Sequence, residues 1–258
     1  MAPAQAVNLP PLLSIEHLSK RFGAVQATDD VSLSLMPGEV HGLIGPNGAG
    51  KTSLIGQISG SIAPDAGVIR FDGADITRLP QHRRVERGLA RSFQITRLFK
   101  GFSALENMAV AVQARSGSNL SFWKPVSRET ALRDEAQALL ADLGLAARAD
   151  SRADQLSHGE QRTLEVGLAL ATRPRLLLLD EPMAGSGPEE SQQMAELINR
   201  IRSKVSILLI EHDVDAVFKL ADRVSVLVYG RIIASDEPAK VRADPQVIAA
   251  YLGDEQGA

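Results

Sequence analysis

The feature that most limits the fold is a glycine-rich loop, GPNGAGKTS, at residues 45–53. It matches the pattern GxxxxGK[ST], with an apolar segment at 39–44 before it and an expected helix at 51–59 after it. Strand, loop and helix in this order bind phosphate, because backbone N–H groups and the helix N-terminus face one anion. The loop therefore predicts an α/β nucleotide-binding chain. The predicted contacts to the nucleotide are Gly45, Pro46, Asn47, Gly48, Ala49, Gly50, Lys51, Thr52 and Ser53.

Composition excludes several kinds of site. The 258 residues include no cysteine, so disulfides, thiol nucleophiles and zinc–thiolate sites are absent. The five histidines form no HxH or HxxxH pair, so we expect no histidine metal site. The formal net charge is −3 with both signs mixed along the chain, which argues against nucleic acid as the main partner.

No segment of the sequence has the pattern of a secretory signal or a membrane-spanning helix. The N-terminal MAPAQAVNLPPLL has no basic region and no long apolar run, so it does not resemble a secretory signal. The longest apolar runs, LLLL at 176–179 and ILLI at 207–210, are too short to cross a bilayer. We expect a soluble cytoplasmic chain, which could still dock on a membrane protein.

Apolar runs alternate with helical patterns along most of the chain, which favours a mostly parallel sheet with helices on its faces. The expected strands lie at 13–18, 31–35, 39–44, 67–72, 89–93, 175–180 and 205–211, with a final hairpin from 224–230 and 231–236. The expected helices of this part lie at 51–59, 160–172, 188–202 and 213–220.

The middle of the chain differs in pattern. It is rich in Ala and Leu, with its clearest amphipathic stretch at 128–145 and a polar, turn-like segment at 116–127. We interpret it as a helical insertion into one α/β domain. The expected division is a loose tail at 1–12, a single domain at 13–258 with its core at 13–94 and 161–252, the helical insertion at 95–160, and a tail at 253–258.

Two acidic residues end the apolar run LLLLDEP at 176–182. Lys51 would reach the β- and γ-phosphates, Thr52 would ligate Mg²⁺, and Asp180 would hold the Mg²⁺ shell through water. Glu181 could polarise the water that attacks the γ-phosphorus. The alternative, in which both acids only begin a solvated loop, is less favoured because the same chain contains a phosphate loop.

Two further polar residues follow expected strands. His212 follows the strand at 205–211, and Gln94 ends the segment LARSFQ. Loops at the carboxyl ends of parallel strands share one edge of the sheet, where ligands bind. We therefore expect His212 and Gln94 beside Lys51 and the two acids, although a strand-end histidine or a surface amide with only a structural role is the alternative.

The stretch LSHGEQ at 156–161 predicts a helix start. Ser157 can be the N-cap, and Glu160 can bond back to it in a capping box. The small residues around Gly159 leave a donor-rich helix end with no evident partner nearby in the sequence. We expect this end to face an anion.

Together these residues resemble the ATP-binding-cassette (ABC) ATPases over roughly residues 13–252. Five motifs occur in the family's order: Walker A at 45–53, the Q-loop glutamine at Gln94, the signature at 156–161, Walker B with its catalytic glutamate at 176–181, and the switch histidine at His212. The resemblance implies a P-loop NTPase fold with an antiparallel β subdomain and an inserted helical subdomain, and MgATP as the ligand.

The resemblance also assigns roles to residues. Phe22 in KRFGAV is similar to the aromatic that stacks on adenine. The implied catalytic residues are Gln94, Glu181 and His212. The implied Mg²⁺ ligands are Thr52, Gln94 and Asp180. The family works as a head-to-tail dimer, so the implied contacts to the γ-phosphate held by the other subunit's Lys51 are Ser157, His158, Gly159 and Glu160.

Two departures from the family pattern stand out. The usual signature LSGGQ is LSHGEQ here, so His158 replaces a glycine and Glu160 a glutamine. The D-loop, usually SALD, is AGSG at 184–187, without its aspartate. The second departure puts the cross-subunit coupling of that loop in doubt, but not hydrolysis.

Several stretches resemble one subgroup, the ATPases of branched-chain (hydrophobic) amino acid importers: 92–108, 116–127, 156–171, 180–191 and 247–255. This implies a peripheral subunit on the cytoplasmic face of the inner membrane, with two permeases, a second ATPase as homo- or heterodimer, and a solute-binding protein as partners. Residues 98–105 would grip the permease. The alternatives are a urea or amide importer, lipopolysaccharide export, or a soluble ABC ATPase without a transporter, and no nucleic acid partner is expected.

Overall fold

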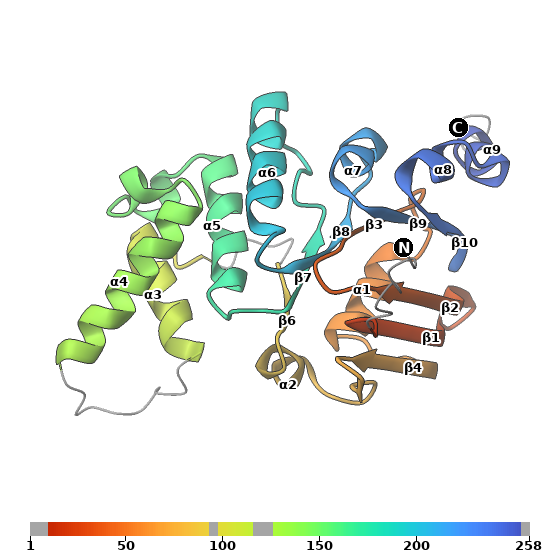
Figure 1. Cartoon of the computed structure of the whole chain (residues 1–258), viewed down its shortest axis with the longest axis horizontal. Helices are drawn as coiled ribbons and strands as arrows, with labels where there is room; N and C mark the ends of the chain where they lie inside the picture. Colours follow the sequence, from red (N-terminus) through yellow and green to blue (C-terminus); the bar gives the residue numbers. More distant parts are fainter. Residues whose placement is uncertain (1–9, 93–97, 116–125, 254–258) are drawn as a thin grey trace, which may run out of the picture.

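The computed structural model describes residues 10–92, 98–115 and 126–253, which form two sheets with helices between and around them (Figure 1). A six-stranded sheet has the order β10-β9-β3-β8-β7-β6, and a four-stranded sheet has the order β2-β1-β4-β5. Within the described ranges, no helix is both long and apolar enough to span a membrane.

The six-stranded sheet is parallel except at one edge. Its strands in sheet order are β10 (Arg231–Asp236), β9 (Arg223–Val228), β3 (Val40–Ile44), β8 (Ser206–Ile210), β7 (Leu176–Asp180) and β6 (Leu89–Arg91). The antiparallel strand is β10, which pairs with β9 in the predicted final hairpin. The α/β class with a mostly parallel core is therefore confirmed.

The apolar central strands are buried on both faces, as their continuous hydrophobic runs predict. In β7, Leu176 and Leu178 pack with the antiparallel sheet, whereas Leu177 and Leu179 pack with the helices on the opposite face. All four side chains are 0% exposed. A polar residue at any of these positions would therefore bury a polar group without a hydrogen-bond partner.

The antiparallel sheet confirms the expected β subdomain, but two of its strands are longer than the predicted ranges 13–18 and 31–35. It consists of β2 (Val25–Leu35), β1 (Leu13–Phe22), β4 (Ala66–Phe71) and β5 (Ala74–Asp75). The hairpin of β1 and β2 contains register shifts, and its two strands continue past the predicted ranges until Phe22 pairs with Val25.

The N-terminal tail prediction is wrong at its last residue. Leu12 is 3% exposed, and its N–H donates to the Leu35 oxygen at 2.8 Å. Its carbonyl accepts the Asp72 N–H at 2.8 Å. Leu12 therefore extends the start of β1 between the ends of β2 and β4, because pairing satisfies both of its backbone groups.

Helices cover both faces of the parallel sheet (Figure 1). Helix α1 (Lys51–Ser59), at its predicted position, packs in the cluster shared with the antiparallel sheet, while α6 (Pro188–Ile201) and α7 (Val214–Leu220) pack on the opposite face. The other helices of this part are α2 (Gln81–Glu86), α8 (Pro238–Arg242) and α9 (Pro245–Gly253).

The helical part lies at one end of the molecule (Figure 1, left). It contains α3 (Ala104–Arg115), α4 (Val126–Asp142), the short turns η1 (Ala146–Arg148) and η2 (Ala153–Gln155), and α5 (His158–Leu170). Helix α5 shares one hydrophobic cluster with both α3 and the parallel sheet, so it connects the two parts. The division of the chain at 160/161 stays a prediction.

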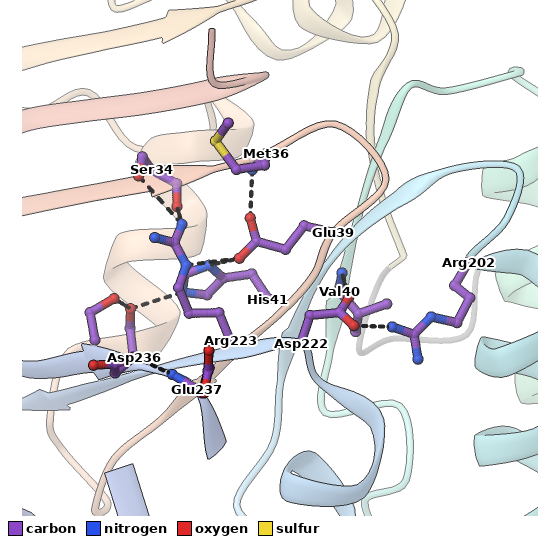
Figure 2. Close-up of polar contacts among 12 residues, drawn as sticks. Ser34, Met36, Glu39, Val40, His41, Arg202, Asp222, Arg223, Asp236 and Glu237 are labelled. Atoms are coloured by element: carbon purple, nitrogen blue, oxygen red, sulfur yellow. Dashed lines mark hydrogen bonds and ion pairs between the residues drawn. The ribbon is translucent and has the colours of Figure 1, made fainter. Parts of the chain in front are cut away.

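A closed polar cluster lies at the amino ends of the parallel strands (Figure 2). His41 is 0% exposed, with its Nδ1 3.0 Å from Glu39 Oε1 and its Nε2 2.8 Å from Ser225 Oγ. Arg223 Nε donates to Glu39 Oε1 at 2.9 Å, and Ser225 Oγ lies 2.8 Å from Ser235 Oγ. The cluster joins β3, β9 and β10 at the edge away from the glycine-rich loop.

Candidate nucleotide-binding site

The register of the parallel sheet aligns the predicted site. Ile210 of β8 pairs with Leu43 of β3 on one side and with Asp180 of β7 on the other. Beyond this row, β3 leads into the glycine-rich loop, β7 into Glu181 and β8 into Glu211. The structure therefore brings the loop, the two acids and the start of the His212 loop to one edge of the sheet.

The glycine-rich loop fits a backbone cradle. Gly50, the N-cap of α1, has φ +105°, and a Cβ there would lie 2.1 Å from the Ala27 oxygen. A Cβ on Gly45 would likewise lie 2.1 Å from the Leu227 oxygen. Helix α1 has no side-chain cap and no acidic residue in its first turn. Its N-terminal N–H groups therefore suit an external anion.

Lys51 lies in the cradle. Its side chain is buried, and its Nζ donates to the carbonyl oxygens of Gly45 and, at 3.1 Å, Pro46. Burial lowers the pKa of the Lys51 ammonium, while the charges of Glu181 and Asp180 oppose that shift. A bound phosphate would add negative charge beside the Lys51 ammonium and so offset the cost of its burial. Thr52, the next residue, is exposed and can offer its hydroxyl.

Asp180 is held by a residue that sequence reasoning missed. Its side chain is almost fully buried, and Arg91 Nη2 donates to its Oδ2 at 2.6 Å. Arg91 ends β6, where it pairs in register with Leu178. A cation at the end of the strand beside LLLLD is a signal that could have found this pair. The ion pair fixes the carboxylate at the strand end.

Glu181 and His212 approach each other at the same edge. Glu181 Oε1 lies 3.6 Å from His212 Nδ1, and the two side chains are 23% and 53% exposed. Both groups can therefore reach a substrate from solvent. The predicted neighbourhood of these two residues is confirmed, whereas their catalytic roles stay predictions.

Glu211 is a third acid at this edge, and the sequence interpretation did not use it. It is 1% exposed, and its Oε1 accepts the Met183 N–H at 2.7 Å. Its Oε2 accepts the His212 N–H at 3.3 Å. Burial raises the pKa of the Glu211 carboxyl, and these two N–H groups oppose the rise. Glu211 thus joins the chain after Glu181 to the His212 loop.

The helix start at 157–160 has the predicted capping box. The Glu160 N–H donates to Ser157 Oγ at 3.2 Å, and the Ser157 N–H donates to Glu160 Oε2 at 2.8 Å. Glu160 Oε1 also lies 3.0 Å from Arg148 Nε. The Glu160 carboxylate therefore shapes this helix end, while Ser157 and His158 stay exposed.

The sequence offers no partner near this helix end, but the structure supplies one from a distant segment of the chain. The Gly159 N–H donates to Glu190 Oε1 at 3.1 Å. Glu190 belongs to the first turn of α6, which packs against α5. A carboxylate therefore already occupies the position where an external anion was expected, because a helix N-terminus attracts either one.

The two remaining predicted ligand residues are Phe22 and Gln94. Phe22, the last residue of β1, is 47% exposed and has the Lys20 ammonium 5.3 Å from its ring centroid. This exposure is what stacking on a base requires. Gln94 lies outside the described residues.

The residues present fit a phosphate-bound Mg²⁺ rather than a protein-held metal. Across residues 10–92, 98–115 and 126–253, no group of three or more His, Asp or Glu side chains could hold a metal ion. Mg²⁺ ordinarily binds through one or two protein oxygens together with substrate phosphates. The exposed Thr52 hydroxyl and the Asp180 carboxylate match that small donor set.

The sequence is similar to a known protein family and to several of its members. The family model "ABC transporter" matches residues 28–184, and the model "Branched-chain amino acid ATP-binding cassette transporter" matches residues 231–256. The chain is 39% identical over 251 residues to the high-affinity branched-chain amino acid transport ATP-binding protein BraF of Pseudomonas aeruginosa. It is 38% identical over 251 residues to LivG of Escherichia coli, a protein of the same description. Each alignment covers 95% of this chain and 98% of the relative.

A solved structure also matches over nearly the full length. The ADP conformation of MJ1267, an ATP-binding cassette of an ABC transporter, superposes with a TM-score of 0.83 at 30% identity. The match covers 95% of this chain and 100% of that chain. With the family match and the similarity to full-length relatives, it follows that the chain belongs to the ABC transporter ATP-binding proteins and is an ATPase.

Proposed function

We propose that the protein is the ATP-hydrolysing subunit of an importer for branched-chain or related amino acids. The observation that carries the substrate class is the match of residues 231–256 to the branched-chain amino acid cassette model. The loop, acids and histidine at one sheet edge support the ATPase chemistry.

Each residue of the edge has a defined task in this proposal. Lys51 binds the β- and γ-phosphates, and Phe22 stacks on the adenine. Thr52 and Asp180, with Gln94, would hold Mg²⁺, which neutralises phosphate charge when bound. Glu181 takes a proton from the attacking water. His212 holds that water or the γ-phosphate in line for the attack. Most of the rate comes from positioning and charge stabilisation.

The signature end of α5 acts on a second nucleotide. In a head-to-tail dimer, Ser157, His158 and Gly159 would meet the γ-phosphate bound by the other subunit's loop. The exposure of Ser157 and His158 supports this role. Because Glu190 accepts the Gly159 N–H in the single subunit, the phosphate must displace that carboxylate. Ser157→Arg should abolish ATP turnover and leave ATP binding to the loop nearly intact.

An exposed aromatic pair supports a permease contact. Phe99 and Phe102 are 54% and 46% exposed, and their ring centroids lie 5.3 Å apart. Large apolar side chains that gather on a surface commonly mark a protein interface. They lie within 98–105, the segment proposed to grip the permease. The permeases would hold the subunit at the cytoplasmic face of the inner membrane and connect it to a solute-binding protein.

Uptake by native cells tests the proposed function. Cells that lack the gene should lose import of radiolabelled leucine, and the wild-type gene should restore it. A gene encoding Lys51→Ala should not restore import, because the phosphate cradle loses its cation. Restored import by Lys51→Ala would refute the ATPase role. Unchanged leucine import with loss of urea, amide or lipopolysaccharide transport would retain the ATPase and replace the substrate.

A further inference from the structure

The backbone of Glu181 has an unusual conformation. Its φ is +49°, in the left-handed region that residues other than glycine rarely adopt. Such a conformation costs free energy and persists only where the surroundings hold it. The side chain of Glu181 leaves the sheet edge from this residue, so whatever holds the backbone also sets the direction of the carboxylate.

Two neighbours hold the Glu181 backbone. Its N–H donates to the Ile210 oxygen at 2.9 Å, which continues the pairing of β7 with β8. Its carbonyl oxygen accepts a hydrogen bond from Arg162 Nη2 at 2.6 Å. Arg162 Nε also donates to the Pro182 oxygen at 3.4 Å. The guanidinium therefore spans two consecutive carbonyls of the turn, which its planar fork of donors allows.

Arg162 is itself fixed in place. Its side chain is 19% exposed, and its Nη1 lies 3.7 Å from Glu165 Oε2, one turn further along α5. Glu165 is 7% exposed at its side chain, so the ion pair lies mostly away from water. An ion pair in such surroundings is screened less than one in solvent.

The position of Arg162 on α5 matters for function. It follows Gly159 by three residues, which places the two residues on the same face of the helix. The Gly159 N–H contacts Glu190, nine residues after Glu181. The first turns of α5 therefore grip the segment 181–190 at both of its ends. This is the helix whose N-terminus is proposed to meet the other subunit's ATP.

We infer that Arg162 is a positioning residue that couples the two ATP sites of the dimer. When a γ-phosphate in trans draws in the α5 N-terminus, Arg162 transmits the shift to the Glu181 carbonyl and aims the carboxylate at its own subunit's ATP. The inference rests on the proposed function, because it needs the trans contact at Ser157 and Gly159. It offers a connection between the sites that does not use the aspartate missing from the D-loop.

Turnover and ATP binding of full-length variants test this inference. Arg162→Gln should lower kcat about 100-fold, since a misplacement of about 1 Å in a catalytic group has that effect. Its Kd for ATP should stay within about threefold of wild type, because the phosphate loop is untouched. Arg162→Lys, which keeps the charge but not the fork, should recover only part of the lost kcat.

Arg115, the last residue of α3, offers a matched control because it contacts the opposite end of α5. Arg115 is 24% exposed and contacts the Ala171 oxygen at 2.9 Å and Glu135 at 2.8 Å. It thus bonds a carbonyl and a carboxylate, as Arg162 does, but at the C-cap of α5 rather than at the catalytic turn. Arg115→Gln should change kcat less than about threefold.

The outcomes separate the inference from the proposed function. Equal loss of kcat in Arg162→Gln and Arg115→Gln would overturn the inference in favour of general support of α5, and wild-type kcat in Arg162→Gln would also overturn it. Failure of the proposed function would give a different result, namely a Glu181→Gln variant that hydrolyses ATP at the wild-type rate. If Arg162→Gln folds poorly, Arg162→Lys gives the same test, because kcat equal to wild type would contradict the need for two carbonyl contacts.

Discussion

The two edges of the parallel sheet carry the same kinds of side chain with opposite properties. At the carboxyl edge, Glu181 and His212 lie 3.6 Å apart and are 23% and 53% exposed. At the amino edge, Glu39 and His41 lie 3.0 Å apart and are 8% and 0% exposed (Figure 2). An acid and a histidine therefore occur at both edges, but only one pair is accessible to a substrate.

The amino-edge cluster is closed by its own partners. His41 contacts Glu39 and Ser225 with its two ring nitrogens, while Glu39 also accepts from Arg223 and from the Met36 N–H at 2.6 Å. Such a complete network stabilises and specifies the packing of strands. At the carboxyl edge, by contrast, the N-terminus of α1 has no side-chain cap. The buried Lys51 ammonium contacts only backbone carbonyls of its loop. Incomplete partners and exposure, rather than residue type, mark the edge that binds ligand.

The comparison predicts its largest effect for Glu181→Gln. Turnover should fall about 1000-fold, because a general base contributes about that factor. ATP should still bind, and the variant should accumulate as an ATP-bound closed dimer, measurable by size-exclusion chromatography with ATP. The melting temperature should stay near wild type since Glu181 is partly exposed. Hydrolysis at the wild-type rate would make the assignment of the base wrong.

Exchanging the two histidines for alanine should separate activity from stability. His212→Ala should lower turnover about 100-fold with little change in the free energy of unfolding. His41→Ala should lower that free energy by about 3 kcal/mol, because it removes one buried hydrogen-bond partner each from Glu39 and Ser225 and leaves a cavity where the ring was. Turnover per folded molecule should then stay unchanged. Urea unfolding and ATPase assays on both variants give the comparison, and the reverse pattern would contradict it.

Local sequence was sufficient where one segment supplies the whole signal. The phosphate loop at 45–53, the capping box of Ser157 and Glu160, and the doubly buried strand at 176–180 all follow from short-range patterns, and the structure has them. The parallel alternation also predicted the meeting of Glu181 and His212, because strand ends share an edge.

Contacts between distant segments were beyond such reasoning. Arg91 with Asp180, Glu190 with Gly159, and Arg162 with the Glu181 carbonyl each join residues from 19 to 89 positions apart. Their sequence signals are single charged residues on helices or strand ends, which most often lie on a solvated surface. They become partners through the packing of α5 on α6 and β7, and of β6 on β7.

Acidification should affect the amino edge through Glu39. Burial acts to raise the pKa of its carboxyl, but the hydrogen bonds with His41 and the Met36 N–H, with the charge of Arg223, outweigh burial and lower the pKa below its ordinary 4.5. The folded pKa is thus below the unfolded pKa. The resulting stability is present above about pH 4.5 and is lost as the pH falls through the folded pKa.

Glu39→Gln tests that dependence. The variant should be less stable than wild type near neutral pH, and the difference should shrink as the pH falls below about 4.5. Urea unfolding at a series of pH values measures both curves. Glu16→Gln is the control, because the Glu16 carboxyl also has a lowered pKa but lies exposed beside Arg70, where solvent screens the pair. A difference between wild type and Glu39→Gln that is constant with pH would contradict the assignment to this carboxyl.

The smallest effect concerns Glu190, a carboxylate that already bonds the helix end proposed to bind phosphate. Glu190 supplies the Gly159 N–H with an internal acceptor at 3.1 Å, so an incoming γ-phosphate must compete with it. Glu190→Ala should lower the ATP concentration at half-maximal turnover about threefold, because a single hydrogen bond contributes about 1 kcal/mol or less. Glu189→Ala, at the exposed neighbouring position, removes the same charge without that contact and should have a smaller effect. A rise in the half-saturating concentration for Glu190→Ala would instead mean that Glu190 holds α5 in the orientation that binds phosphate. The donors at this helix end would then be organised by the carboxylate rather than blocked by it.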